Sequence, residues 1–131
     1  MQTSTAPGLN KKMLYWSDGM PTVFIISPDW KLRATVRAEL REAGVEALGM
    51  ESADDAAREI AAGRMPSAVV LDGVVTGAGL ANLARSVPVI IVASRTESIK
   101  PLPGSEAVLY RPVRVGEIVA RVHEILRGHA S

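Results

Sequence analysis

From position 21 onward, short apolar runs alternate with segments of helical periodicity. Residues 22–26 are β-branched or aromatic without alternation, which is typical of a parallel strand covered on both faces. Residues 30–43 then place apolar side chains at helical spacing up to Gly44, which predicts an amphipathic helix. By the same criteria, further strands are predicted at 45–50, 67–71, 87–93 and 107–110, and further helices at 53–61, 80–86 and 115–127.

This alternation predicts an α/β fold. Parallel strands need right-handed crossovers, and the helices of those crossovers cover both faces of the sheet. We therefore expect a three-layer, doubly wound, five-stranded parallel sheet. Residues 94–105 contain Pro101, Pro103 and Gly104 and lack a helical period, so the helix between the fourth and fifth strands is predicted to be short or absent.

Composition limits the class of protein further. The chain has 131 residues, no cysteine, 47% hydrophobic residues and a formal net charge of +1. These values favour one soluble domain without disulfides or thiolate metal sites. Without a basic surplus, a nucleic acid is not the expected partner, and no apolar run is long enough for a membrane span.

The organisation predicted along the chain has three parts. Residues 1–20 are polar and turn-rich and are interpreted as a disordered or weakly ordered leader. Residues 21–128 form the domain, and residues 129–131 form a tail. The leader lacks the apolar stretch of a signal peptide, so the expected location is cytoplasmic.

Ligands of doubly wound folds collect at the carboxyl ends of the strands. There the sequence places Ser27 to Asp29, Asp72, Ala93 with Ser94, and Arg111 with Pro112. His123 and His129 lie near the C-terminus and support no catalytic or metal assignment. No catalytic residue is predicted, and we do not expect an enzyme.

The order of these motifs resembles the receiver domain of bacterial response regulators, over residues 22–127. The run 69–72 is similar to the third strand that ends on the phosphate-accepting aspartate, here Asp72. Pro88 opens a strand like the fourth, and residues 110–112 stand where the family has Lys-Pro. Glycines at 77 and 79 match a family loop. The resemblance implies the flavodoxin-like strand order 2-1-3-4-5 and a role in two-component phosphorelay signalling.

Several positions depart from the pattern that the family uses for phosphotransfer. Ser27 and Pro28 stand where a receiver has the acidic pair that holds Mg²⁺. Asp29 comes one place later and is expected to cap the following helix. Ala93 replaces the hydroxyl residue that binds the phosphoryl group, while the side chain of the next residue, Ser94, should point to the other side of the sheet.

The basic and aromatic positions of the family differ as well. Arg111 replaces its lysine, and Val108 its aromatic switch residue. These departures predict a non-catalytic pseudo-receiver, in which Asp72 pairs directly with Arg111. No cofactor is expected, and a metal could use at most Asp29 and Asp72.

The predicted mode of action is contact with a protein, which could be a kinase, an output protein or a second copy in a homodimer. By resemblance, the contact face runs from the fourth strand to the last helix. An alternative keeps the family's activity, with Mg²⁺ as cofactor and Asp72 accepting phosphate from a histidine kinase. A third is a small nucleotide-binding flavodoxin-like domain, for which the glycines at 77–79 are weak support.

A basic stripe on the first predicted helix remains outside this scheme. Arg33, Arg37 and Arg41 repeat every four residues, opposite the apolar face of the helix. Such a row is usually a solvated face. Binding of an acidic partner is the alternative function.

Overall fold

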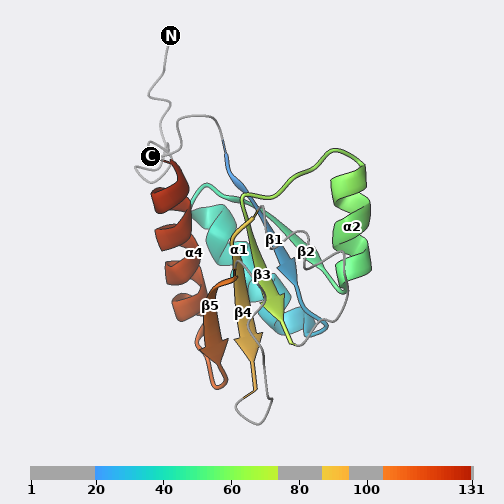
Figure 1. Ribbon diagram of the computed structural model, residues 1–131. Coiled ribbons are helices and arrows are strands. Elements are labelled where there is room, and N and C mark those ends of the chain that lie inside the picture. Colours follow the sequence, from blue (N-terminus) through green and yellow to red (C-terminus); the bar gives the residue numbers. More distant parts are fainter. Residues whose placement is uncertain (1–19, 74–86, 95–104, 131) are drawn as a thin grey trace.

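The computed structural model describes residues 20–73, 87–94 and 105–130. Strands and helices alternate along these segments (Figure 1). The strands are β1 (Thr22–Ile26), β2 (Glu46–Met50), β3 (Ala68–Asp72), β4 (Val89–Ala93) and β5 (Ser105–Tyr110). The helices are α1 (Trp30–Glu42), α2 (Ala53–Ala61) and α4 (Val115–Ala130).

The five strands form one sheet in the order β2-β1-β3-β4-β5, and every neighbouring pair is parallel. β1 and β3 are therefore central, while β2 and β5 lie at the edges. The registers pair Ile26 with Met50 and with Leu71. The first three strands therefore end side by side, with their carboxyl ends on the same side of the molecule. This order confirms the predicted doubly wound fold.

Two apolar clusters fill the layers on either side of the sheet. One joins side chains of the strands to α1 and α4, including Val36, Leu40 and Ile118, which are fully buried. The other packs Phe24 and Leu71, among others, against α2. Figure 1 shows α1 and α4 on one side of the sheet and α2 on the other. Strands covered on both faces explain the uninterrupted apolar runs of the sequence.

Glycine ends the first helix as predicted. The N–H of Gly44 donates to the carbonyl of Arg41 at 3.1 Å, and its φ of 86° is a left-handed conformation that favours glycine. The N–H of the next residue, Val45, still donates to the carbonyl of Leu40 in the helix, at 3.0 Å. β2 begins one residue later, at Glu46.

Several element ends differ from the prediction, most of them by one or two residues, among them the start of β5 and the end of α4. β5 begins at Ser105 instead of residue 107, and α4 continues through Gly128 to Ala130, beyond its predicted end and into the predicted tail. Four other predictions fall outside the described residues: the leader at 1–19, the glycine loop at 77–79, the helix at 80–86, and the short or absent helix after β4. Within the described segments, no helix has the length and hydropathy of a membrane span.

Candidate functional site

The polar site lies at the carboxyl ends of three strands. Asp72 is the last residue of β3, Ser27 follows β1, and Arg111 follows β5. Two backbone hydrogen bonds continue the pairing between neighbouring strands at the residues just after β3 and β5. The N–H of Gly73 donates to the carbonyl of Val92 at 2.8 Å, and the N–H of Arg111 to that of Ala93 at 2.7 Å. Residues far apart in the sequence are thereby brought to one place.

Both carboxylate oxygens of Asp72 are bound by other side chains. The hydroxyl of Ser27 donates to Oδ2 at 2.7 Å, and Nη2 of Arg111 donates to Oδ1 at 2.6 Å. The Asp72 side chain is only 7% exposed, whereas that of Arg111 is 41% exposed. The direct pairing of Asp72 with Arg111 that the sequence predicted is confirmed. A nearly buried carboxylate is held by one neutral donor and one cation.

Ser27 connects this carboxylate to the start of α1. It is fully buried, and its Oγ accepts the N–H of Asp29 at 3.0 Å while donating to Asp72. The carboxylate of Asp29 accepts the N–H groups of Lys31 at 3.0 Å and Leu32 at 3.3 Å. Asp29 is therefore the N-cap of the helix, as predicted, and its Oδ1 satisfies two donors of the first turn.

The donor set does not fit a magnesium ion. Magnesium is usually bound through one or two carboxylates together with phosphate oxygens and water. Asp72 presents both oxygens to Ser27 and Arg111, Asp29 is engaged in capping, and Pro28 has no ligand atom in its side chain. In the described part of the chain, no group of three or more acidic or histidine side chains is arranged to hold a metal.

The other predicted pocket residues have distinct surroundings. Ala93 ends β4 and is 1% exposed, packed in the apolar cluster on the α2 side of the sheet, against which half-buried Val108 also packs. Ser94 follows Ala93 and is half-buried. Pro112 is exposed and joined to Arg111 by a cis peptide bond. Ala93 therefore contributes a buried methyl group and no hydrogen-bonding group.

Sequence reasoning missed one contact. It considered Ser27 only as a replacement for an acidic metal ligand, whereas the structure makes it a hydrogen-bond donor to Asp72. The available signal was a hydroxyl placed directly after a central strand, next to the strand that ends on a carboxylate. Adjacent central strands bring such side chains together when their ends are in register.

Comparison with known proteins supports the fold. No family profile matches the sequence, and no curated protein matches it. Among solved structures, the receiver domain of the Francisella response regulator 1452 has a TM-score of 0.68 at 20% identity, over 85% of this chain and 99% of that one. A response regulator receiver protein from Burkholderia phymatum has a TM-score of 0.64 at 23% identity, over 81% of this chain and 94% of that one.

A CheY-like receiver domain from Methylobacillus flagellatus has a TM-score of 0.64 at 14% identity, over 82% of this chain and 99% of its own. At these identities the likeness establishes the fold. The chain has the receiver fold of two-component signalling proteins. Within that fold, the carboxylate at the end of β3 is bonded on both oxygens by the protein itself.

Proposed function

We propose that this protein is a receiver-like signalling module that works by protein contact and does not undergo Mg²⁺-dependent phosphorylation of Asp72. The observation that carries the proposal is the double engagement of Asp72, by Ser27 at 2.7 Å and by Arg111 at 2.6 Å. Phosphoryl transfer would require one of these oxygens as nucleophile and further positive charge for the transferred group. Here the carboxylate is already neutralised by an internal cation.

Two features of the pocket support the same proposal. Ser27 and Pro28 supply no carboxylate for a metal, and Ala93 supplies no hydroxyl. Arg111 bonds Asp72 directly, so the cation is used in the resting molecule rather than on a phosphoryl oxygen. The site resembles a receiver pocket held permanently in one state.

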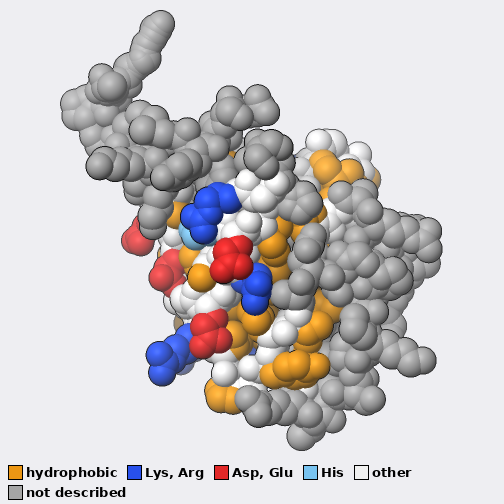
Figure 2. Space-filling view, turned by 60° about the vertical axis from the view of Figure 1, so that its left-hand side comes forward, with side chains coloured by type: hydrophobic (Ala, Val, Ile, Leu, Met, Phe, Trp, Pro, Cys, Tyr) orange, Lys and Arg blue, Asp and Glu red, His pale blue; other side chains and the backbone are white. Residues whose placement is uncertain are grey.

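The proposed contact surface is the face from β4 through β5 to α4. Tyr110, at the end of β5, is 46% exposed. α4 buries Ile118 and Val122 and directs charged residues such as Arg121 and Glu124 to solvent. Figure 2, in which the side of the molecule carrying α4 comes forward, shows acidic and basic side chains interspersed there. Such a mixed surface suits a protein partner, whether a kinase, an output protein or a second copy, better than a nucleic acid.

The test is incubation with acetyl phosphate and Mg²⁺, followed by intact-mass spectrometry under conditions that preserve acyl phosphates. The expected result is an unchanged mass. The control is Asp72→Asn, which removes the acceptor and shows the background from other sites. A phosphoryl adduct on the unmodified protein that is missing from Asp72→Asn would refute the proposal and establish the alternative, phosphate acceptance on Asp72.

A further inference from the structure

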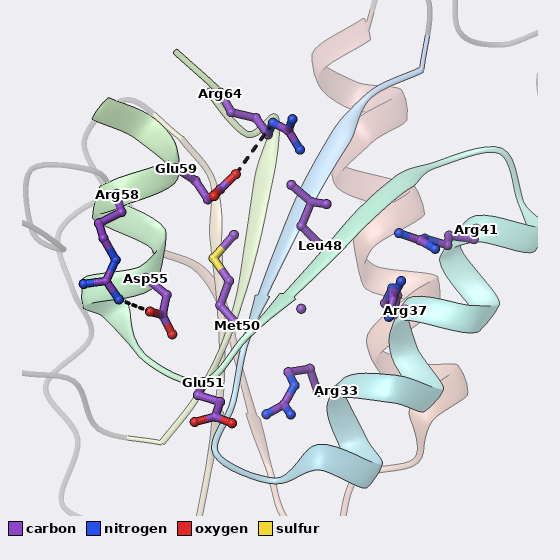
Figure 3. A pocket seen from close by; sticks show the side chains of 11 residues that line it. Arg33, Arg37, Arg41, Leu48, Met50, Glu51, Asp55, Arg58, Glu59 and Arg64 are labelled. Atoms are coloured by element: carbon purple, nitrogen blue, oxygen red, sulfur yellow. Dashed lines mark hydrogen bonds and ion pairs between the residues drawn. The ribbon is translucent and has the colours of Figure 1, made fainter. Parts of the chain in front are cut away.

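A second concave site lies along β2, between α1 and α2 (Figure 3). The cavity has a volume of about 740 Å³ and is lined by five arginines and three carboxylates. In Figure 3, arginines extend toward it from α1 on one side, while charged residues of α2 and the segment after it lie on the other.

The floor of the groove is the free edge of β2. β2 is the last strand of the sheet, with β1 as its neighbour. The N–H of Glu46 donates to the carbonyl of Pro21, and the carbonyl of Met50 accepts the N–H of Ser27, each at 2.9 Å. These groups of β2 therefore point toward β1. Backbone groups alternate along a strand, and those of Ala47 and Gly49 therefore point away from β1. Gly49 is exposed and lines the groove, whereas Ala47 is fully buried.

Contacts of nearby arginine side chains agree with this orientation of the backbone groups. Nε of Arg41 donates to the carbonyl of Ala47 at 3.3 Å, which is possible because that carbonyl points outward. A Cβ on Gly49 would lie 2.7 Å from Cγ of Arg33, so glycine allows the Arg33 side chain to lie closely against the strand. Arg33 reaches the carbonyl of Ser27 through Nη1 at 2.8 Å.

The charges of the two walls differ. On the α2 side, Arg58 pairs with Asp55, and Nε of Arg64 lies 3.7 Å from Glu59. On the α1 side, among the described residues, Arg33 and Arg41 bond to backbone carbonyls and Arg37, which is exposed, makes no ion pair. The α2 wall is internally neutralised. Glu51, after β2, is the third carboxylate of the lining, so the three arginines of the α1 wall leave the groove with an excess of positive charge.

We propose that the β2 edge is a strand-addition site for an extended acidic segment of a partner protein. The segment's backbone pairs with Gly49 and, where its N–H displaces Arg41 from the carbonyl of buried Ala47, with Ala47 as well. Alternate side chains of an added strand face opposite sides of the sheet. Carboxylates on one side meet Arg37 and Arg41, and apolar side chains on the other lie toward half-buried Leu48.

The charge pattern favours this occupant over two others. A second copy paired through β2 would bring two arginine rows together. The N-terminal segment of this chain offers Lys11 and Lys12 but only one acidic residue, Asp18, so it lacks the complementary charge. The groove is separate from the face between β4 and α4, and the proposal does not depend on whether Asp72 accepts phosphate.

The test is an NMR titration of the isotope-labelled protein with a short peptide that alternates glutamate and valine and has blocked ends. The expected result is saturable binding with the largest amide shifts at Ala47 and Gly49. The double variant Arg37→Ala/Arg41→Ala should bind roughly tenfold more weakly, the effect of losing two exposed ion pairs. The matched control, Arg121→Ala/Arg127→Ala on α4, should bind like the unmodified protein.

Three companion probes separate strand addition from simple charge attraction. A lysine–valine peptide should not bind, inorganic phosphate should not reproduce the shifts at Ala47 and Gly49, and N-methylation of alternate peptide bonds should abolish binding. Thermal melts of both double variants establish that they are folded. Equal binding of the N-methylated or the lysine peptide, the same shifts with phosphate, or no shifts at the two edge residues would each overturn the proposal.

Discussion

Replacing Arg111 with alanine should destabilise the fold, because the carboxylate of Asp72 would keep its burial and lose its cation. Breaking a buried ion pair costs about 3–5 kcal/mol, whereas exposed pairs contribute about 0–1 kcal/mol. Asp72 is 7% exposed and Arg111 is 41% exposed, so solvent screens one partner. The remaining Ser27 hydroxyl also limits the loss. We expect a cost of about 1–2 kcal/mol, or a fall in Tm of about 3–8 °C for a domain of this size.

The assay is a double-mutant cycle of Arg111→Ala and Asp72→Asn, measured by urea unfolding with circular dichroism. Asn keeps an acceptor for the Ser27 hydroxyl while removing the charge. The two substitutions should be non-additive, with a coupling energy of about 1–2 kcal/mol, because each removes the same ion pair. Arg121→Ala, which breaks an exposed pair with Glu124, is the control and should cost less than about 0.5 kcal/mol.

The reasoning would be refuted by a coupling energy indistinguishable from zero. That result would mean that Arg111 and Asp72 do not stabilise the folded state together. A decrease in the free energy of unfolding that is no larger in Arg111→Ala than in Arg121→Ala would lead to the same conclusion. The burial of Asp72 is the reason for expecting a larger decrease in Arg111→Ala.

Three further substitutions test neighbouring contacts. Asp29→Ala should lower the free energy of unfolding by about 1 kcal/mol through loss of the N-cap of α1; an unchanged urea midpoint would contradict the capping role. Ser27→Ala should cost about 1–3 kcal/mol, because an oxygen of Asp72 loses its donor; a stability equal to that of the unmodified protein would disprove that contact. Arg58→Ala should return the pKa of Asp55, which the hydrogen bond from Arg58 lowers, toward 3.8, as measured by NMR titration.

The Asp55 effect has a defined sign. A pKa lower in the folded than in the unfolded state gives stability that is present above the unfolded pKa and lost as pH falls through the folded pKa. The contribution of the Arg58–Asp55 contact should therefore disappear in acid. A pKa of Asp55 that is the same with and without Arg58 would show that the contact does not form in solution.

The fold was predictable because its strands are buried on both faces. β1 has the bounds that the apolar run predicts, and β3 lies within one residue of its predicted bounds. The start of β5 was missed because Ser105 and Glu106 carry no apolar pattern. α4 passes through Gly128, whose backbone has helical geometry despite its freedom, so a residue that usually ends a helix gave the wrong boundary.

The site was predictable in part. The parallel topology implied that Asp72 and Arg111 would meet, and helix-capping preference identified Asp29. The hydrogen bond from Ser27 depends on the register between β1 and β3, which the sequence does not state.

The arginine stripe was expected to be a solvated face, with an acidic partner as the alternative. Whether Arg33 and Arg41 would bond the backbone of their own domain depends on how α1 lies against the edge strand. Helical periodicity places the stripe on one side of α1, but it does not specify the position of that side relative to β2.

The most direct test of the central claim is a titration with Mg²⁺ and beryllofluoride, a mimic of the aspartyl phosphate, followed by the amide signals of Asp72 and Gly73. The account predicts no saturable change, because Ser27 and Arg111 hold both oxygens of the carboxylate. Asp72→Asn provides the baseline for nonspecific effects of the salts. Saturable shifts at these amides that depend on Mg²⁺ and vanish in Asp72→Asn would contradict the account.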